Sequence, residues 1–161
     1  MSVAHDIYSE TNPAFCALAL VAFTTAYLSV NAEGPEVPAA YLALPVALAG
    51  DLGRCFEGTN KNTGLLEWLN RQPRVQVGLA NLINTSMDIV TDAIRFGCFS
   101  RVLLISPTAK LVLGTLTVKK SAVTSLSDVP ARSIKRAERL GFWFASVGST
   151  RTVFDMMGLT V

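Results

Sequence analysis

Few residues in the sequence could act in catalysis or bind a metal ion, and they are widely spaced. Asp88 and Asp92 lie four positions apart, which places both carboxylates on one face of a helix. Such a pair can hold Mg²⁺ or transfer protons, although a solvated helix face is its more common role. His5, the single histidine, lies near the N-terminus and is a poor partner for a Ser or Cys nucleophile. Metal-ligand spacing is also absent among the three cysteines, Cys16, Cys55 and Cys98.

Known catalytic motifs are missing from the sequence as well. There is no GxxxxGK[ST] or GxGxxG loop for phosphate, no GxSxG nucleophile turn and no HExxH zinc motif. The sequence therefore predicts a chain that is not an enzyme, with no catalytic residue, no cofactor and no metal ion.

Basic residues are concentrated in the C-terminal part of the chain. Between positions 95 and 151 there are ten Lys and Arg residues, opposed only by Asp128 and Glu138. Four of the ten fall on one expected helix: Arg132, Lys135, Arg136 and Arg139. They form a solvated helix face, contact an acidic surface of a partner protein, or contact DNA phosphates. The net charge of +2 is too small to choose among these three interpretations.

Aromatic residues follow the basic ones on the same helix. Phe144 aligns with other apolar positions of the helix and is expected in the core. A helix cannot bury three consecutive side chains on one face, so Phe142 or Trp143 lies under another element of this chain or against a partner. We predict partner contacts for Phe142, Trp143 and Phe154, because exposed aromatic side chains often dominate binding energy.

The first expected helix lies in an uncharged segment, residues 11–32. Asn12 and Pro13 favour the start of a helix, which we expect to continue to about Val30. The helix is long enough to approach a membrane span. Its flanks carry acids and no basic anchor, and polar and small side chains along it suit packing in a protein interior. We therefore predict a central helix, covered partly by the chain and partly by a partner.

The next segment is interrupted by Pro38 and Pro45, which predict a break in any long helix. Residues 41–45 are expected to be extended and residues 46–56 helical. With 50% apolar and only 16% charged residues, the chain either spans a membrane or covers apolar surface with a partner.

The middle of the chain has the pattern of helices followed by a hairpin. We expect a short helix capped by Thr63, a second opening at Pro73, and a third over residues 86–96 that Gly97 ends. Two β-rich runs, 99–106 and 110–118, predict a hairpin. Three helices and a hairpin over residues 64–118 are the order of a winged helix-turn-helix. Carboxylates on its third helix would repel phosphates, so protein contact is favoured over DNA reading.

The predicted fold class is mainly α with a small β-hairpin (α+β). A last long helix begins near Pro130, with Ser127 or Asp128 as its cap, and a short helix follows. We divide the chain into an N-terminal helical segment (residues 1–62), a winged-helix-like region (63–120) and C-terminal basic and aromatic helices (121–161), forming one compact unit.

Four stretches in this order then carry a family resemblance: NPAFCALAL, YLALPVAL, LLEWLNRQPRVQVGLA and KRAERLGFWFASVGSTRTVFDMMGL. The last is the most specific, with its signature at Arg136-Ala137, Leu140-Gly141, Trp143-Phe144-Ala145, Gly148-Ser149, Phe154 and Gly158-Leu159. The chain resembles the middle component of three-component ABC systems, which are bacterial and archaeal conflict systems. The chain also resembles the small subunit of Lamassu-type anti-phage and anti-plasmid systems.

The resemblance implies a non-enzymatic adaptor. In such systems an SMC- or Rad50-like ABC ATPase that senses foreign DNA is encoded beside a middle component and an effector, often a nuclease. The middle protein would link the two, and double-stranded DNA would be engaged through the complex. We expect a cytoplasmic protein without a membrane span. The alternatives are a stand-alone winged-helix DNA-binding protein and a small membrane protein held by residues 13–30.

Overall fold

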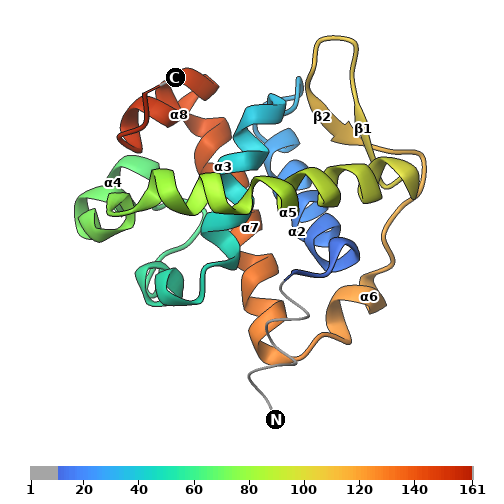
Figure 1. Cartoon of the computed structure of the whole chain (residues 1–161), viewed down its shortest axis with the longest axis horizontal. Coiled ribbons are helices and arrows are strands. Elements are labelled where there is room, and N and C mark those ends of the chain that lie inside the picture. Colours follow the sequence, from blue (N-terminus) through green and yellow to red (C-terminus); the bar gives the residue numbers. More distant parts are fainter. Residues whose placement is uncertain (1–10, 161) are drawn as a thin grey trace.

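The uncharged segment forms the central helix of the protein. In the computed structural model, which describes residues 11–160, helix α2 (Pro13–Leu28) begins where the Asn12 side chain accepts a hydrogen bond from the Ala14 N–H at 2.9 Å. Helices α7 and α5 pack against α2, and Leu20 and Phe23 are fully buried between the elements (Figure 1). The prediction of a buried central helix is confirmed. His5 and the acidic flank residues Asp6 and Glu10 lie outside the described residues.

Both prolines of the next segment lie within one helix, α3 (Val37–Leu48). The prediction that residues 41–45 are extended is therefore wrong. Pro38 occupies the first turn, where a backbone N–H has no helical partner, and Pro45 lies one turn before the end. Side chains 42–47 are all buried, and this packing offsets the hydrogen bond that Pro45 cannot donate. The chain then bends by 91° into a 3₁₀ helix, η1 (Gly50–Phe56), within the residues 46–56 that the sequence predicts to be helical.

The middle of the chain differs most from its prediction. After α4 (Leu65–Arg71) and the 3₁₀ turn η2 (Pro73–Gln76), one continuous helix, α5 (Leu79–Phe99), replaces the two expected helices. The boundary expected before residue 86 lies inside this helix, where the Thr85 hydroxyl donates to the Asn81 carbonyl at 2.9 Å. The three-helix order of a winged helix is therefore not found here, and a winged helix is not confirmed.

Two residues in this region do not have the roles that the sequence predicts. Gly97 does not end a helix but lies within α5, where a Cβ atom would stand 2.6 Å from the Cδ1 atom of Leu103. Thr63 does not cap α4, whose N-cap is Gly64; its hydroxyl instead accepts a hydrogen bond from the Asn60 N–H at 3.0 Å. In both cases the role of the residue depends on a contact that the local helix pattern does not show.

The predicted hairpin is present as strands β1 (Leu103–Ile105) and β2 (Leu111–Leu113), paired antiparallel with Leu104 opposite Val112. The free edge of β2 is partly covered by the loop before α3. There the Leu111 N–H donates to the Pro35 carbonyl at 2.7 Å, and the Val37 N–H donates to the Ala109 carbonyl at 3.2 Å. The hairpin is thereby fixed to the N-terminal half of the chain.

The C-terminal part contains α6 (Lys120–Thr124), α7 (Asp128–Val147) and α8 (Thr150–Met156). Of the five apolar positions that the sequence predicts for the inner face of α7, Ile134, Ala137, Leu140 and Phe144 are buried, and Val147 is half-buried. Helix α7 approaches α2 closely at Gly141, where a Cβ atom would stand 2.3 Å from the Phe23 carbonyl oxygen. Only glycine allows this separation of the two backbones.

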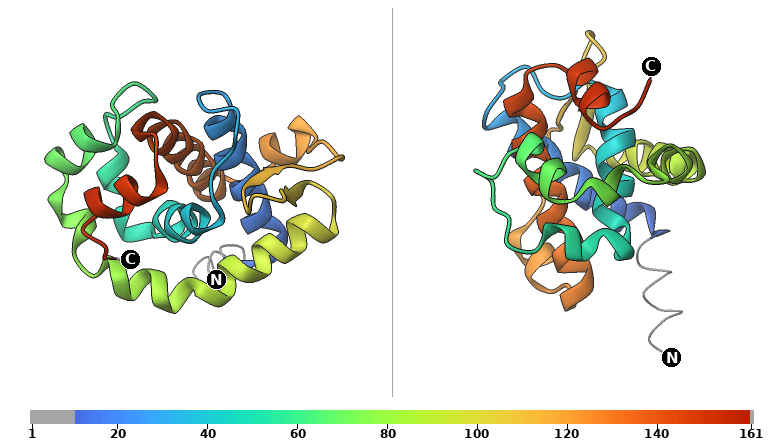
Figure 2. Two further views of the ribbon diagram at one scale, coloured as in Figure 1. Left: turned by 90° about the horizontal axis from the view of Figure 1, so that it is seen from above. Right: turned by 90° about the vertical axis from the view of Figure 1, so that its left-hand side faces the viewer.

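The elements form one layered assembly around α2, α3 and α7, with α5 lying along one side (Figure 2). The predicted fold class, mainly helical with a small hairpin, is confirmed. One hydrophobic core draws side chains from all three predicted regions, while their boundaries stay a prediction. Within residues 11–160 no single helix is both long and apolar enough to cross a membrane; only α3 and η1 taken together, across their bend, have that length and composition.

Candidate functional site

The four predicted basic residues of α7 fall into two different environments. Arg136 is only 8% exposed, and its guanidinium donates to the Ala49 carbonyl at 3.3 Å and to the Ser133 hydroxyl at 3.4 Å. Arg139 donates through one nitrogen to the Phe56 carbonyl at 3.1 Å and the Thr59 hydroxyl at 2.9 Å. These two arginines therefore join α7 to η1 and to the loop after it.

The other two basic residues remain on the surface. Lys135 is exposed, and Arg132 is exposed while forming an ion pair with Asp128 one turn earlier. Burial lowers the pKa of the Arg139 guanidinium from its ordinary value, and the nearby Glu138 carboxylate opposes this shift. An arginine stays protonated under such a shift, so all four side chains contribute positive charge.

A basic hollow of about 620 Å³ lies between η1 and α7. It contains all four α7 cations and adds Arg54 from η1, with Phe56 and Val129 as its apolar lining and Glu57 as its acid. A smaller hollow of about 340 Å³ adjoins it and shares Lys135 and Arg139. The sequence indicated the α7 cations but not Arg54, because nothing in the local pattern shows that η1 folds back beside α7.

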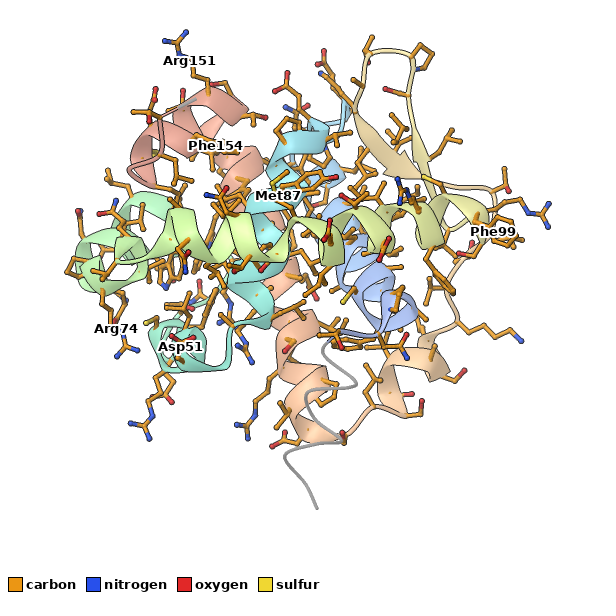
Figure 3. All side chains as sticks on the ribbon, viewed as in Figure 1. Asp51, Arg74, Met87, Phe99, Arg151 and Phe154 are labelled. Carbon is orange, nitrogen blue, oxygen red and sulfur yellow. The ribbon has the colours of Figure 1, made fainter. Side chains whose placement is uncertain are left out.

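The three predicted aromatic contacts are not brought together. Trp143 is 0% exposed, and its indole N–H donates to the Asn60 carbonyl at 3.0 Å. It stacks on Phe56 and contacts Trp68, so it belongs to the core and offers no surface to a partner. Phe142 is half-buried in the wall of the smaller hollow, with the Lys61 ammonium 5.8 Å from its ring centre. Phe154 lies half-buried on α8 (Figure 3).

The carboxylate pair does not develop into a metal site. Asp88 and Asp92 are exposed on α5, and Asp92 lies 3.7 Å from the Arg95 guanidinium. In the part of the chain that the structure describes, no group of three His, Cys, Asp or Glu side chains is placed to hold a metal ion.

A second surface, which sequence reasoning missed, is apolar. Phe99 is 90% exposed at the last turn of α5, beside the base of the hairpin (Figure 3). We call it and the other exposed apolar residues of this region the apolar end: Phe96, Phe99, Leu104, Ile105, Leu113 and Leu116. The sequence carries a signal for this surface, because the predicted hairpin has apolar side chains at consecutive positions. A two-stranded ribbon can bury only one of its faces, so some of these side chains must be exposed.

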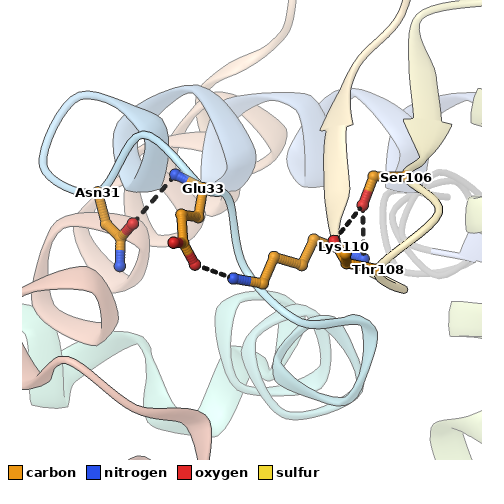
Figure 4. A network of polar contacts seen from close by, with 5 residues as sticks. All are labelled: Asn31, Glu33, Ser106, Thr108 and Lys110. Atoms are coloured by element: carbon orange, nitrogen blue, oxygen red, sulfur yellow. Dashed lines mark hydrogen bonds and ion pairs between the residues drawn. The ribbon is translucent and has the colours of Figure 1, made fainter.

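The hairpin turn is held in place by a polar network (Figure 4). Lys110 forms an ion pair with Glu33, whose own N–H donates to the Asn31 side chain at 3.1 Å. The Ser106 hydroxyl accepts a hydrogen bond from the Lys110 N–H at 3.1 Å. The hydrogen bond from Lys110 lowers the pKa of Glu33, and the same bond raises the pKa of Lys110. This network positions the apolar end relative to α2 and α3.

Comparison with known families identifies the chain. Residues 2–161 match the family model described as ABC-three component (ABC-3C) system Middle Component 3. The chain belongs to this family. No match was found to a curated protein or to a solved structure.

The family places this middle component in a system with an ABC ATPase. Its two candidate surfaces are separated in space. The hairpin and η1 lie on opposite sides of the molecule in Figures 1 and 2. This middle component therefore presents its apolar end and its basic hollow on different sides of the molecule.

Proposed function

We propose that the chain is a non-catalytic adaptor in a prokaryotic anti-phage and anti-plasmid defence complex of the Lamassu type. It would link an SMC-like ABC ATPase, which senses foreign DNA, to an effector nuclease. The observation that carries this proposal is the family match over residues 2–161, because a middle component of a three-component ABC system acts with an ATPase.

The surface of the protein supports a binding role. The apolar end exposes Phe99 and five further large apolar side chains around one helix terminus and one hairpin. Exposed large apolar side chains that gather in one region are typical of protein–protein contacts, and aromatic residues among them often carry much of the affinity. We assign this surface to one of the two partner proteins.

The non-catalytic part of the proposal rests on the sequence, which contains none of the common phosphate-binding, nucleophile or zinc motifs. Participation of double-stranded DNA would come through the assembled complex.

The proposal is tested by co-expressing the chain with the ATPase and the effector encoded beside it. We expect all three proteins to co-purify through an affinity tag on this chain and to remain together at high salt. The adaptor role is excluded if neither partner is retained while the tagged chain is folded and monodisperse.

A further inference from the structure

The basic hollow has a definite wall on each side. Helix α7 provides Arg132 and Lys135 as exposed cations, and η1 provides exposed Arg54 opposite them. Arg136 and Arg139 form the base and join the two walls through hydrogen bonds to backbone carbonyls. The hollow is therefore a concave site in which three exposed cations surround Arg136, which is buried, and Arg139, which is half-buried.

Its chemistry suits a carboxylate. Five basic residues line the hollow, whereas Glu57 is the one acid among its lining residues in the described chain. A guanidinium offers two parallel N–H donors that match a carboxylate or a phosphate, so an anionic group would gain charge-assisted hydrogen bonds here.

Two observations favour an acidic protein segment over a nucleic-acid backbone. Carboxylates border the cations, with Glu138 in the adjoining hollow and Asp128 paired to Arg132. Because like charges repel, they would disfavour a continuous line of phosphates more strongly than one or two carboxylates. The lining also includes Val129, whose exposed side chain can contact an apolar side chain of a peptide.

We propose that the basic hollow between η1 and α7 receives an acidic segment of a partner protein. Carboxylates of that segment contact Arg54, Arg132 and Lys135, and an apolar neighbour packs on Val129. This inference rests on the proposed adaptor function and specifies the chemistry of one of its contacts.

The test compares charge reversal inside and outside the hollow. The double variant Arg54→Glu/Lys135→Glu reverses two exposed cations of the site. The matched control Lys120→Glu/Arg151→Glu makes the same change of net charge at exposed positions on α6 and α8. Thermal unfolding of both variants verifies that the fold is retained. Binding of each full-length variant to the purified ATPase and to the purified effector is then measured separately, at low and high salt.

We expect the site variant to lose about tenfold or more in affinity for one partner, and the control variant to bind as the wild type does. The wild-type affinity for that partner should also fall as salt is added. If the wild type binds at least one partner and the site variant binds every such partner equally well, the inference is overturned while the adaptor function stands. If the wild type binds neither partner, both are overturned.

A short DNA duplex, titrated against the same proteins, separates the two kinds of occupant. We expect no difference in duplex binding between the site variant and its control. Duplex binding that only the site variant loses, with partner binding unchanged, would assign the hollow to nucleic acid and overturn the inference.

Discussion

The Trp143 indole N–H donates to the backbone carbonyl of Asn60 at 3.0 Å, across 83 positions of sequence. The same ring lies parallel to the Phe56 ring, at 6.0 Å between centres. The most recognisable aromatic residue of the C-terminal signature therefore fixes the loop after η1 to α7. A residue expected to contact a partner instead has a structural role.

Replacing Trp143 with Ala is expected to lower the free energy of unfolding by about 3–5 kcal/mol, because a fully buried ring and its hydrogen bond are lost. The matched change Phe142→Ala, at the half-buried neighbour, should cost much less. Denaturant unfolding measures both. Equal losses would contradict the assignment of Trp143 to the core.

The contact between α7 and α2 predicts the effect of a single methyl group. Gly141→Ala places a Cβ atom 2.3 Å from the Phe23 carbonyl oxygen, so the helices must separate, at an expected cost of about 1–3 kcal/mol. Gly50→Ala is the control, since no atom lies within 4 Å of the added carbon. If thermal unfolding shows that Gly141→Ala leaves the stability unchanged, the two helices are not closely packed there.

Arg139 is expected to matter for stability more than for binding. Arg139→Met removes hydrogen bonds to the Phe56 carbonyl and the Thr59 hydroxyl, which should lower the free energy of unfolding by about 1–3 kcal/mol. Lys135→Met, an exposed neighbour on the same helix, should change it by less than about 0.5 kcal/mol. The reverse order in urea unfolding would contradict the role of Arg139 in holding η1.

The ion pair between Glu33 and Lys110 predicts a pH dependence with a definite sign. Because the pKa of Glu33 is lowered in the folded state, its contribution to stability is present above the unfolded-state pKa and is lost as pH falls through the folded-state pKa. The pKa of Lys110 is raised, so its contribution is present below its unfolded-state pKa and is lost as pH rises through the folded-state pKa.

NMR titration of the Glu33 carboxyl checks this pair. Lys110→Met should move the pKa of Glu33 upward toward its ordinary value, whereas Lys61→Met, which removes a cation outside this network, should leave it in place. A wild-type Glu33 that already titrates at its ordinary value would show that the ion pair does not form.

Phe99 provides the sharpest test of the apolar end. Phe99→Asp should change the free energy of unfolding by less than about 0.5 kcal/mol, because the ring is 90% exposed. It should weaken binding to one partner by about tenfold or more. Val77→Asp, at a residue that follows η2 and is 82% exposed, is the control and should bind normally. If both variants bind alike, the apolar end is not an interface.

Elements with strong local signals could be predicted from the sequence. Asn12 and Pro13 start α2 as expected, and the apolar positions of α7 are its buried face. Where tertiary contacts overrode local preference, prediction failed. Pro45 is helical because its neighbours are buried, and Gly97 is helical because Leu103 packs against its bare Cα.

The candidate site was only partly predictable for the same reason. The α7 cations are visible as a cluster, but the separation of Arg136 and Arg139 from the exposed pair depends on the carbonyls of Ala49 and Phe56, more than 80 positions away. No local pattern reports such a contact. The exposure of Phe99 likewise depends on how little of the hairpin and helix end the rest of the chain covers.

We propose that this chain links the ATPase to the effector. The most direct test is the association of the purified ATPase with the purified effector, measured by size-exclusion chromatography with and without the middle component. We predict that the ATPase and the effector elute together only when the middle component is present. Their co-elution in its absence, unchanged by its addition, would contradict the adaptor function.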